Sequence, residues 1–98
     1  MYEVGQGVAK DARRAVQWYL QAAAKGEAIA QYNLGALLES GRGVEQDHVE
    51  ALKWLNIAED NGSKQAAESR RLVEGLVTAE QIAEAKKRAD TWLKRIGR

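Results

Sequence analysis

The chain lacks cysteine, proline and phenylalanine, and its only aromatic residues are three tryptophans and three tyrosines. Without cysteine it can form neither a disulfide framework nor a thiolate metal site. The absence of proline, together with abundant alanine, favours helices over turns and sheets. No apolar run approaches the ~18 residues of a membrane-spanning helix, and the first residues show no signal peptide. The 98 residues therefore predict one small helical domain, for which cytoplasmic and periplasmic locations both fit.

Charge is distributed unevenly along the chain. Residues 1–62 carry six Lys or Arg and nine Asp or Glu, whereas residues 63–98 carry nine and five. A basic end raises nucleic acid as a partner, but aromatic residues interleaved for base stacking are missing. We therefore expect a solvated helix face and keep a nucleic-acid-binding module as an alternative. The cations of this face are Lys86, Lys87, Arg88, Lys94, Arg95 and Arg98.

The sequence matches itself when it is shifted by 36 residues. Self-similarity at a fixed period of about 20–50 residues is the signature of repeat architectures. The matched positions hold structurally special residue types, chiefly glycine, alanine, tryptophan and aspartate. The pairs are Glu3 and Glu39, Gly5 and Gly41, Gly7 and Gly43, Val8 and Val44, Asp11 and Asp47, Ala15 and Ala51, Trp18 and Trp54, Ala22 and Ala58, Gly26 and Gly62, and Ala30 and Ala66.

The repeated residues predict where helices begin and end. Asp11 and Asp47 stand at predicted helix starts, where a carboxylate can accept N–H groups of the first turn. Gly26 and Gly62 follow helices at left-handed positions, and the Gly-x-Gly pairs at 5–7 and 41–43 predict loops. Thr78 and Gln81 form a T-x-x-Q capping box. The predicted helices are 11–25, 28–40, 47–60, 64–75 and 79–95.

Three of these helices carry an A-x-x-W pair. Alanine and tryptophan three residues apart share one helix face, so the pattern predicts a core seam that recurs along the chain rather than a ligand-stacking site. The tryptophans are Trp18, Trp54 and Trp92, and the alanines are Ala15, Ala51 and Ala89.

These motifs resemble the Sel-one-like repeat, a relative of the tetratricopeptide repeat. The resemblance covers residues 1–67 closely and 68–98 loosely. Two departures stand out: the first unit begins at Met1-Tyr2 without most of its first helix, and Arg70 and Arg71 replace Leu34 and Gly35 in the last. The motifs that carry it are Ala30-Gln31-Tyr32-Asn33-Leu34-Gly35, Gly41-Arg42-Gly43-Val44, Asp47, Ala51, Trp54 and Gly62.

The resemblance implies an all-α protein, an α/α superhelix (a TPR-like solenoid) of antiparallel helix pairs with a C-terminal capping helix. Its single domain divides into a partial first repeat over 1–26, a full second repeat over 27–62, and a degenerate third repeat with the capping helix over 63–98. Terminal repeats of such arrays are atypical because one side must face water. We expect the chain to be the C-terminal piece of a longer, bacterial array.

Catalytic chemistry finds little support in the residues. His48 is the only histidine, whereas structural metal sites usually need three or four ligands, so we expect a solvated surface histidine. Gly41-x-Gly43 lacks the preceding strand and third glycine of a dinucleotide fingerprint. No cysteine is present, and Ser40, Ser63 and Ser69 lie far in sequence from His48. The sequence predicts no enzyme, no metal and no cofactor.

The resemblance implies an interaction scaffold or adaptor that binds a peptide or protein on its concave face. A hydrolytic repeat protein of the penicillin-binding type is the catalytic alternative, although such proposals concern mainly cysteine-bridged members. Val16 and Leu20, left uncovered by the shortened first unit, predict self-association. The residues expected on the concave face are Ile29, Tyr32, Ala36, Glu39, Ser40, Gln65 and Glu68.

Overall fold

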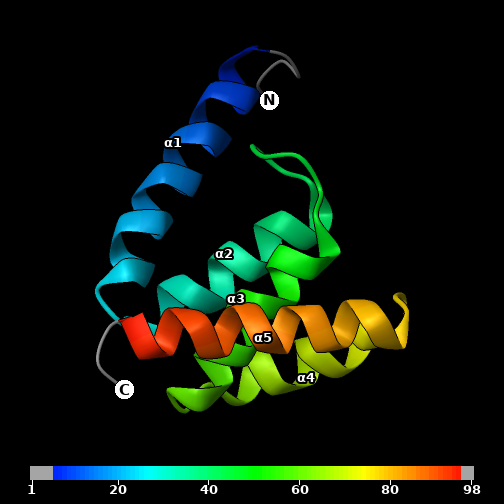
Figure 1. Cartoon of the computed structure of the whole chain (residues 1–98). Helices are drawn as coiled ribbons and strands as arrows, with labels where there is room; N and C mark the ends of the chain where they lie inside the picture. The colour runs from blue at the N-terminus through cyan, green and yellow to red at the C-terminus, as the bar shows by residue number, and fades with distance from the viewer. Residues whose placement is uncertain (1–5, 96–98) are drawn as a thin grey trace.

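The computed structural model describes residues 6–95, with side chains from residue 13 onward, and every element in that range is a helix (Figure 1). The helices end where the sequence offers glycine or a short polar turn, and no strand occurs between residues 6 and 95. They are α1 (Gln6–Ala24), α2 (Ala28–Ser40), α3 (His48–Asp60), α4 (Lys64–Glu74) and α5 (Ala79–Arg95).

The predicted start of the first helix is wrong. Helix α1 begins at Gln6, so Asp11 lies inside the helix and Gly7 belongs to the helix rather than to a loop. Gly5 and the three residues of the chain after Arg95 lie outside the described part. The reason is that nothing between Gln6 and Asp11 breaks a helix: there is no proline, and one glycine costs only about 1 kcal/mol relative to alanine.

The other predicted caps are confirmed. Asp47 Oδ1 accepts a hydrogen bond from the Glu50 backbone N–H at 3.0 Å, which caps α3. Thr78 Oγ1 accepts from Gln81 N at 3.1 Å, and Gln81 Oε1 accepts from Thr78 N at 3.0 Å, which closes the capping box of α5. Gly62 follows α3 with a φ of 98°, the left-handed conformation that glycine adopts without penalty. Helix ends were therefore encoded locally.

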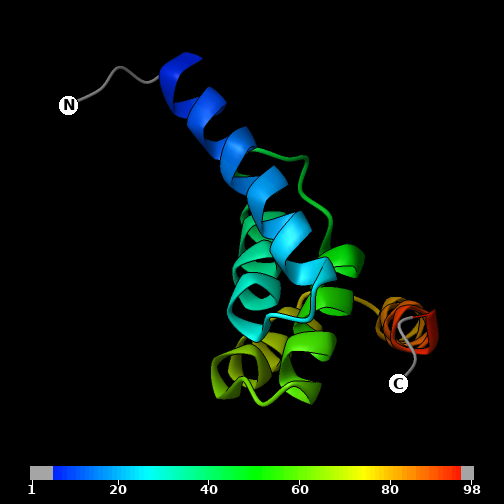
Figure 2. The same ribbon diagram turned by 90° about the vertical axis from the view of Figure 1, so that its left-hand side faces the viewer.

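Helix α3 is the centre of the fold. Helices α2 and α4 lie on one side of it and α5 on the other (Figure 2). One face of α3 packs with α2 and with Ala89 of α5, in a cluster that α1 joins through α2, while its other face packs with α4 and Ala85 of α5. The residues of α3 that are buried in this way are Ala51, Leu52, Trp54, Leu55, Ile57 and Ala58.

The predicted tryptophan seam forms only between α3 and α5. The rings of Trp54 and Trp92 meet edge to face with centroids 5.3 Å apart, next to the buried Ala51 and Ala89. Trp18, by contrast, is 60% exposed, so its assignment to the core is wrong.

Trp18 is exposed because α1 packs against α2 and diverges from α3 toward its own N-terminal end (Figure 1). The buried stripe of α1 runs through Val16, Ala22 and Ala23 with Tyr19 beside it, which leaves Trp18 on the open side. The expectation that Val16 is uncovered is also wrong, because Val16 is buried. The expectation for Leu20 is confirmed, since Leu20 is exposed.

A buried amide ties three parts of the chain together. Gln31 is fully buried on α2, and its Nε2 donates to the Ala23 carbonyl oxygen of α1 at 3.0 Å. Its Oε1 accepts from Asn61 Nδ2, at the end of α3, at 2.9 Å. Burying an amide is tolerated when both of its ends are hydrogen-bonded. Gln31 therefore fixes how α1, α2 and the α3–α4 turn meet.

Candidate functional site

The side of the molecule formed by α2 and α4 contains a groove of about 280 Å³. Helix α3 forms its floor. The groove is predominantly apolar, and two of its residues, Leu72 and Leu76, are largely exposed, at 75% and 64%. Residues lining the groove are Gly35, Ala36, Glu39, Leu55, Ser69, Leu72, Val73 and Leu76.

Small residues on α2 give the groove its depth. Gly35 is buried against α3, and a Cβ atom added there would lie 2.9 Å from the Leu55 side chain and 3.2 Å from the Ala51 carbonyl oxygen. Real Cβ atoms essentially never come that close to another atom, so only glycine lets α2 approach α3 in this way. Ala36, the next residue, is exposed and adds little side chain to the wall. The repeat glycine of the sequence thus shapes the groove.

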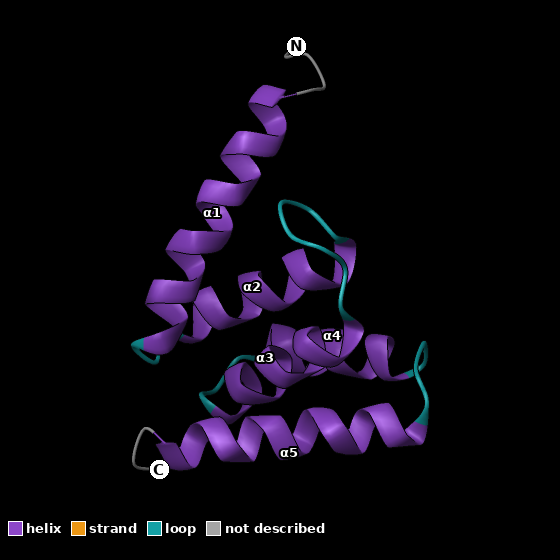
Figure 3. Ribbon diagram, turned by 45° about the horizontal axis from the view of Figure 1, so that its top comes forward, coloured by secondary structure: helices purple, strands orange, loops and turns teal. Residues whose placement is uncertain are grey.

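Glu39 lies at the groove and is half-buried. Its Oε2 is 3.8 Å from His48 Nδ1, and its backbone carbonyl oxygen accepts from Gln46 Nε2 at 2.6 Å. The latter bond belongs to the loop over residues 41–47 that joins α2 to α3 (Figure 3). His48 is not the solvated surface residue that was expected: its side chain is half-buried, and its Nδ1 is shielded from solvent without a hydrogen-bond partner.

Two of the residues expected on the concave face, Ala36 and Glu39, line the groove. Tyr32 instead packs against the core cluster that contains Leu52 and Leu55, and is half-buried. The remaining four are not among the lining residues: they lie on α2 and α4, and each of them is exposed. They are Ile29, Ser40, Gln65 and Glu68.

Sequence reasoning did not identify Ser69, Leu72 and Leu76, which form the α4 side of the groove. The signal was available, because the 36-residue shift places Leu72 on Ala36. Ala36 is exposed, so a leucine at the same position of the next repeat is also expected to be exposed.

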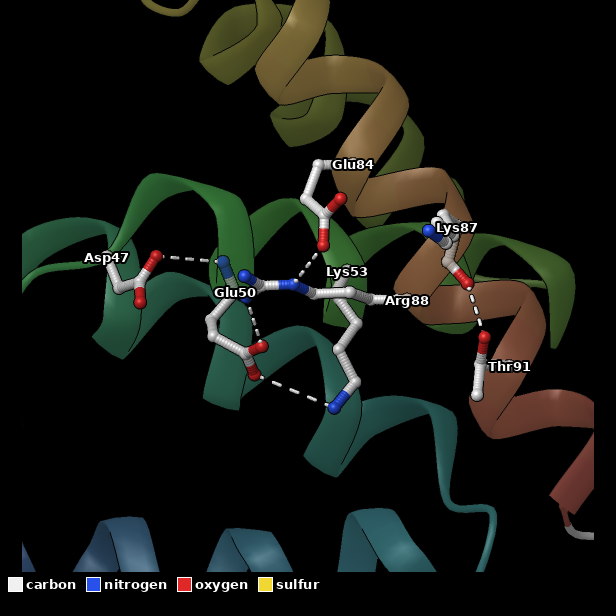
Figure 4. Close-up of polar contacts among 7 residues, drawn as sticks. All are labelled: Asp47, Glu50, Lys53, Glu84, Lys87, Arg88 and Thr91. Carbon is white, nitrogen blue, oxygen red and sulfur yellow. Dashed lines mark hydrogen bonds and ion pairs between the residues drawn. The ribbon is translucent and has the colours of Figure 1, made fainter.

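On the opposite side, ion pairs occupy part of the basic face of α5. Arg88 Nε donates to Glu84 Oε2 at 3.0 Å, and Arg88 Nη1 donates to Glu50 Oε2 of α3 at 2.8 Å (Figure 4). The hydrogen bond that Arg88 donates to Glu84, followed by the one it donates to Glu50, raises the pKa of Arg88. Lys53 completes the cluster, with Nζ 3.6 Å from Glu50 Oε1 and 4.5 Å from the centroid of the Trp54 ring.

The described residues form neither a metal-binding cluster nor a membrane-spanning helix. No three His, Cys, Asp or Glu side chains gather between residues 13 and 95 in a way that could hold a metal ion. None of the described helices combines the length and apolarity that crossing a bilayer requires.

Comparison with known proteins matches this architecture. A family model described as the Sel1 repeat, the Sel-one-like repeat of the sequence motifs, matches residues 1–27 and 28–63. The chitin synthase regulator SKT5 of Saccharomyces cerevisiae is 38% identical over 66 residues, which cover 67% of this chain and 10% of that protein.

A solved structure is similar over most of the chain. The protective antigen c5321, present in uropathogenic Escherichia coli strains and displaying an SLR fold, superposes with a TM-score of 0.82 at 32% identity. The match covers 87% of this chain and 18% of that one. The predicted all-α, TPR-like superhelix is thereby confirmed. The chain spans less than a fifth of the length of either relative.

Proposed function

The chain belongs to the Sel1 repeat family, and on that premise we propose that it is a scaffold that binds a peptide or protein segment in the groove between α2 and α4. Repeats of this family are generally protein–protein interaction modules and typically non-catalytic. The observation that carries the proposal is the pair of exposed leucines, Leu72 and Leu76, on one wall of an apolar groove.

Several features support this assignment. Helix-pair arrays present an extended concave surface that is suited to holding another chain. Contiguous exposed apolar surface on a soluble protein marks an interaction site more often than isolated apolar residues do. Ile29, on the same helix as Ala36, is 76% exposed and extends the apolar surface of α2 beyond the groove. We propose that Tyr32, Ser40, Gln65 and Glu68 form the less apolar margin of the bound surface.

The proposal is tested with a random peptide display library selected on the immobilised chain. Peptides that the wild-type chain enriches are then measured against a variant with Leu72→Asp and Leu76→Asp. We expect at least about a tenfold loss of affinity, which corresponds to about 1.4 kcal/mol. Both leucines are exposed, so the variant should fold normally. Ala83→Asp, at an exposed position of α5, is the control for an added surface charge. Equal binding by the double variant and the control would refute the groove.

A second candidate is self-association through α1. Trp18 and Leu20 of α1 are 60% and 44% exposed and flank its buried stripe of Val16, Ala22 and Ala23. A second copy of the chain would bury them by stacking end to end, as successive repeats stack within one array. Sedimentation of the wild-type chain over a range of concentrations should show association that Trp18→Ser with Leu20→Ser abolishes. A monomer at every concentration rules it out.

The division of the domain is also proposed: a partial repeat over 1–26, a full repeat over 27–62, and a degenerate repeat with its capping helix over 63–98. Helix α5 supports the last unit as a cap, since Trp92 and Ala89 cover α3 while its outer side carries exposed lysines.

A further inference from the structure

We infer that the groove between α2 and α4 selects a polypeptide segment in which a large aliphatic side chain lies next to a lysine or arginine, and that Glu39 binds this cation. The inference rests on the proposed function and adds the chemistry of the partner. It follows from the charge lining the groove, from the unused hydrogen-bonding capacity of Glu39, and from the apolar walls beside it.

The groove lining carries a single negative charge. Of the residues that line the groove, Glu39 is the only charged one. Helix α2, which carries it, contains no lysine, arginine or histidine, and its N-cap residue is another acid, Glu27. The α2 wall therefore presents one negative charge next to apolar surface. A partner that buries this wall without supplying a cation would desolvate a carboxylate with little compensation, which is unfavourable.

The Glu39 carboxylate has free hydrogen-bond acceptor sites within the described residues. Its contact with His48 Nδ1 is 3.8 Å long, beyond hydrogen-bonding distance. Within the described residues, no hydrogen bond reaches either of its oxygens. By contrast, Glu59 accepts from Arg70 at 2.6 Å, and Glu50 accepts from Arg88 at 2.8 Å. Glu39 thus keeps acceptor sites for a ligand, and a charged donor forms the stronger kind of hydrogen bond there.

Leucine and valine side chains form the apolar part of the groove. Leu55 and Val73 form the base, and Leu72 and Leu76 stand at the opening with most of their surface exposed to water. A volume of about 280 Å³ suits an aliphatic side chain rather than a whole helix. Because Glu39 lines the same groove, the aliphatic side chain and the cation must lie close together in the ligand. Leucine, isoleucine or methionine with a neighbouring lysine or arginine meets both requirements.

The test uses the peptides selected by display on the wild-type chain and adds three measurements. Selection on wild type should enrich an aliphatic residue with Lys or Arg beside it. Replacing that Lys or Arg with methionine in a selected peptide should weaken binding to wild type about tenfold but leave binding to Glu39→Gln nearly unchanged. Selection on Glu39→Lys should enrich Asp or Glu in place of the cation. Far-UV circular dichroism of both variants checks that they fold.

The outcomes separate the two proposals. Peptides that depend on Leu72 and Leu76 but show no preference for a cation, or bind Glu39→Gln and wild type equally, overturn the inference and leave the groove proposal standing. Peptides insensitive to Leu72→Asp and Leu76→Asp overturn the groove itself. A wild-type chain that sediments as a dimer, and becomes a monomer with the same two substitutions, identifies a second copy as the occupant and also overturns the inference.

Discussion

Trp18 and Trp54 occupy the same position of successive repeats, and replacing each with alanine gives a sharp comparison. Trp54 is 5% exposed and meets the Trp92 ring at 5.3 Å, whereas Trp18 is 60% exposed and contacts Tyr19 at its edge. Both variants remove a tryptophan from the same repeat position. A difference between their free energies of unfolding is therefore caused by the different surroundings of the two rings.

The burial of each ring sets the magnitude. A buried tryptophan removes roughly 150–250 Å² from water, so at about 25 cal/mol per Å² Trp54 contributes about 4–6 kcal/mol. Part of that area is retained by alanine, and Trp→Ala in a core typically costs about 3–5 kcal/mol. Less than half of Trp18 is buried, so its loss removes at most about 2 kcal/mol. Alanine recovers about 0.5 kcal/mol of that through its higher helix propensity. We expect about 1 kcal/mol for Trp18→Ala.

Denaturant and thermal unfolding followed by far-UV circular dichroism measure both variants. A gap of about 2–4 kcal/mol corresponds to a difference in Tm of roughly 10–25 °C for a domain of this size. Both variants should retain the native helix content at low temperature, which is the control. Equal destabilisation by the two substitutions would refute the reasoning. It would mean that α1 packs onto α3 in solution and repeats the Trp54–Trp92 contact.

Three further substitutions test the fold. Gln31→Met keeps the length of the buried side chain but removes two hydrogen bonds, so the free energy of unfolding should fall by about 1–3 kcal/mol, against little change for the exposed Gln21→Met. Gly35→Ala places a methyl group 2.9 Å from Leu55 and should cost about 1–3 kcal/mol by overpacking, with an accompanying loss of peptide binding in the groove. Thr78→Ala opens the capping box and should cost about 1 kcal/mol in the same unfolding assay, without changing binding.

Much of the fold was readable because its signals are local. Asp47 caps α3, and the Thr78 box caps α5, through bonds that span only three residues. Gly62 takes the left-handed turn that its repeat position predicts. A cap or a left-handed turn depends on the residues beside it, and therefore survives any change in how helices are arranged. The start of α1 was misplaced because the local signal was read alone. Asp11 is a residue type that caps helices, but no residue before it stops the helix, which begins at Gln6.

Arrangement was harder to predict, because burial depends on distant neighbours. The 36-residue period assigns Trp18 and Trp54 one face, yet α3 contacts helices on several sides whereas α1 packs against α2. His48 was assigned to solvent because a lone histidine is too few ligands for a metal site, but Glu39, nine residues earlier, faces it across the loop. Ala36 and Glu39 were expected on one surface because they share a helix face, and both line the groove. Their partners on α4 required knowing how the two helices meet.

The α4 wall of the groove arises where the third repeat departs from the second. At the position of Leu34, which is buried, α4 carries Arg70, whose guanidinium donates to Glu59 at 2.6 Å and to Glu74 at 3.1 Å. These bonds, with that to Glu59 foremost, raise the pKa of Arg70. The bond to Glu59 joins α4 to α3 where the second repeat has a leucine contact, whereas the bond to Glu74 lies within α4. Arg71 replaces the glycine that brings α2 close to α3, so no equivalent close approach is available to α4. Leu72 then lines the opening of the groove at the position of Ala36. Arg70 and Arg71 thus depart from the repeat motif, and the same departure leaves the apolar α4 wall uncovered beside the intact second repeat.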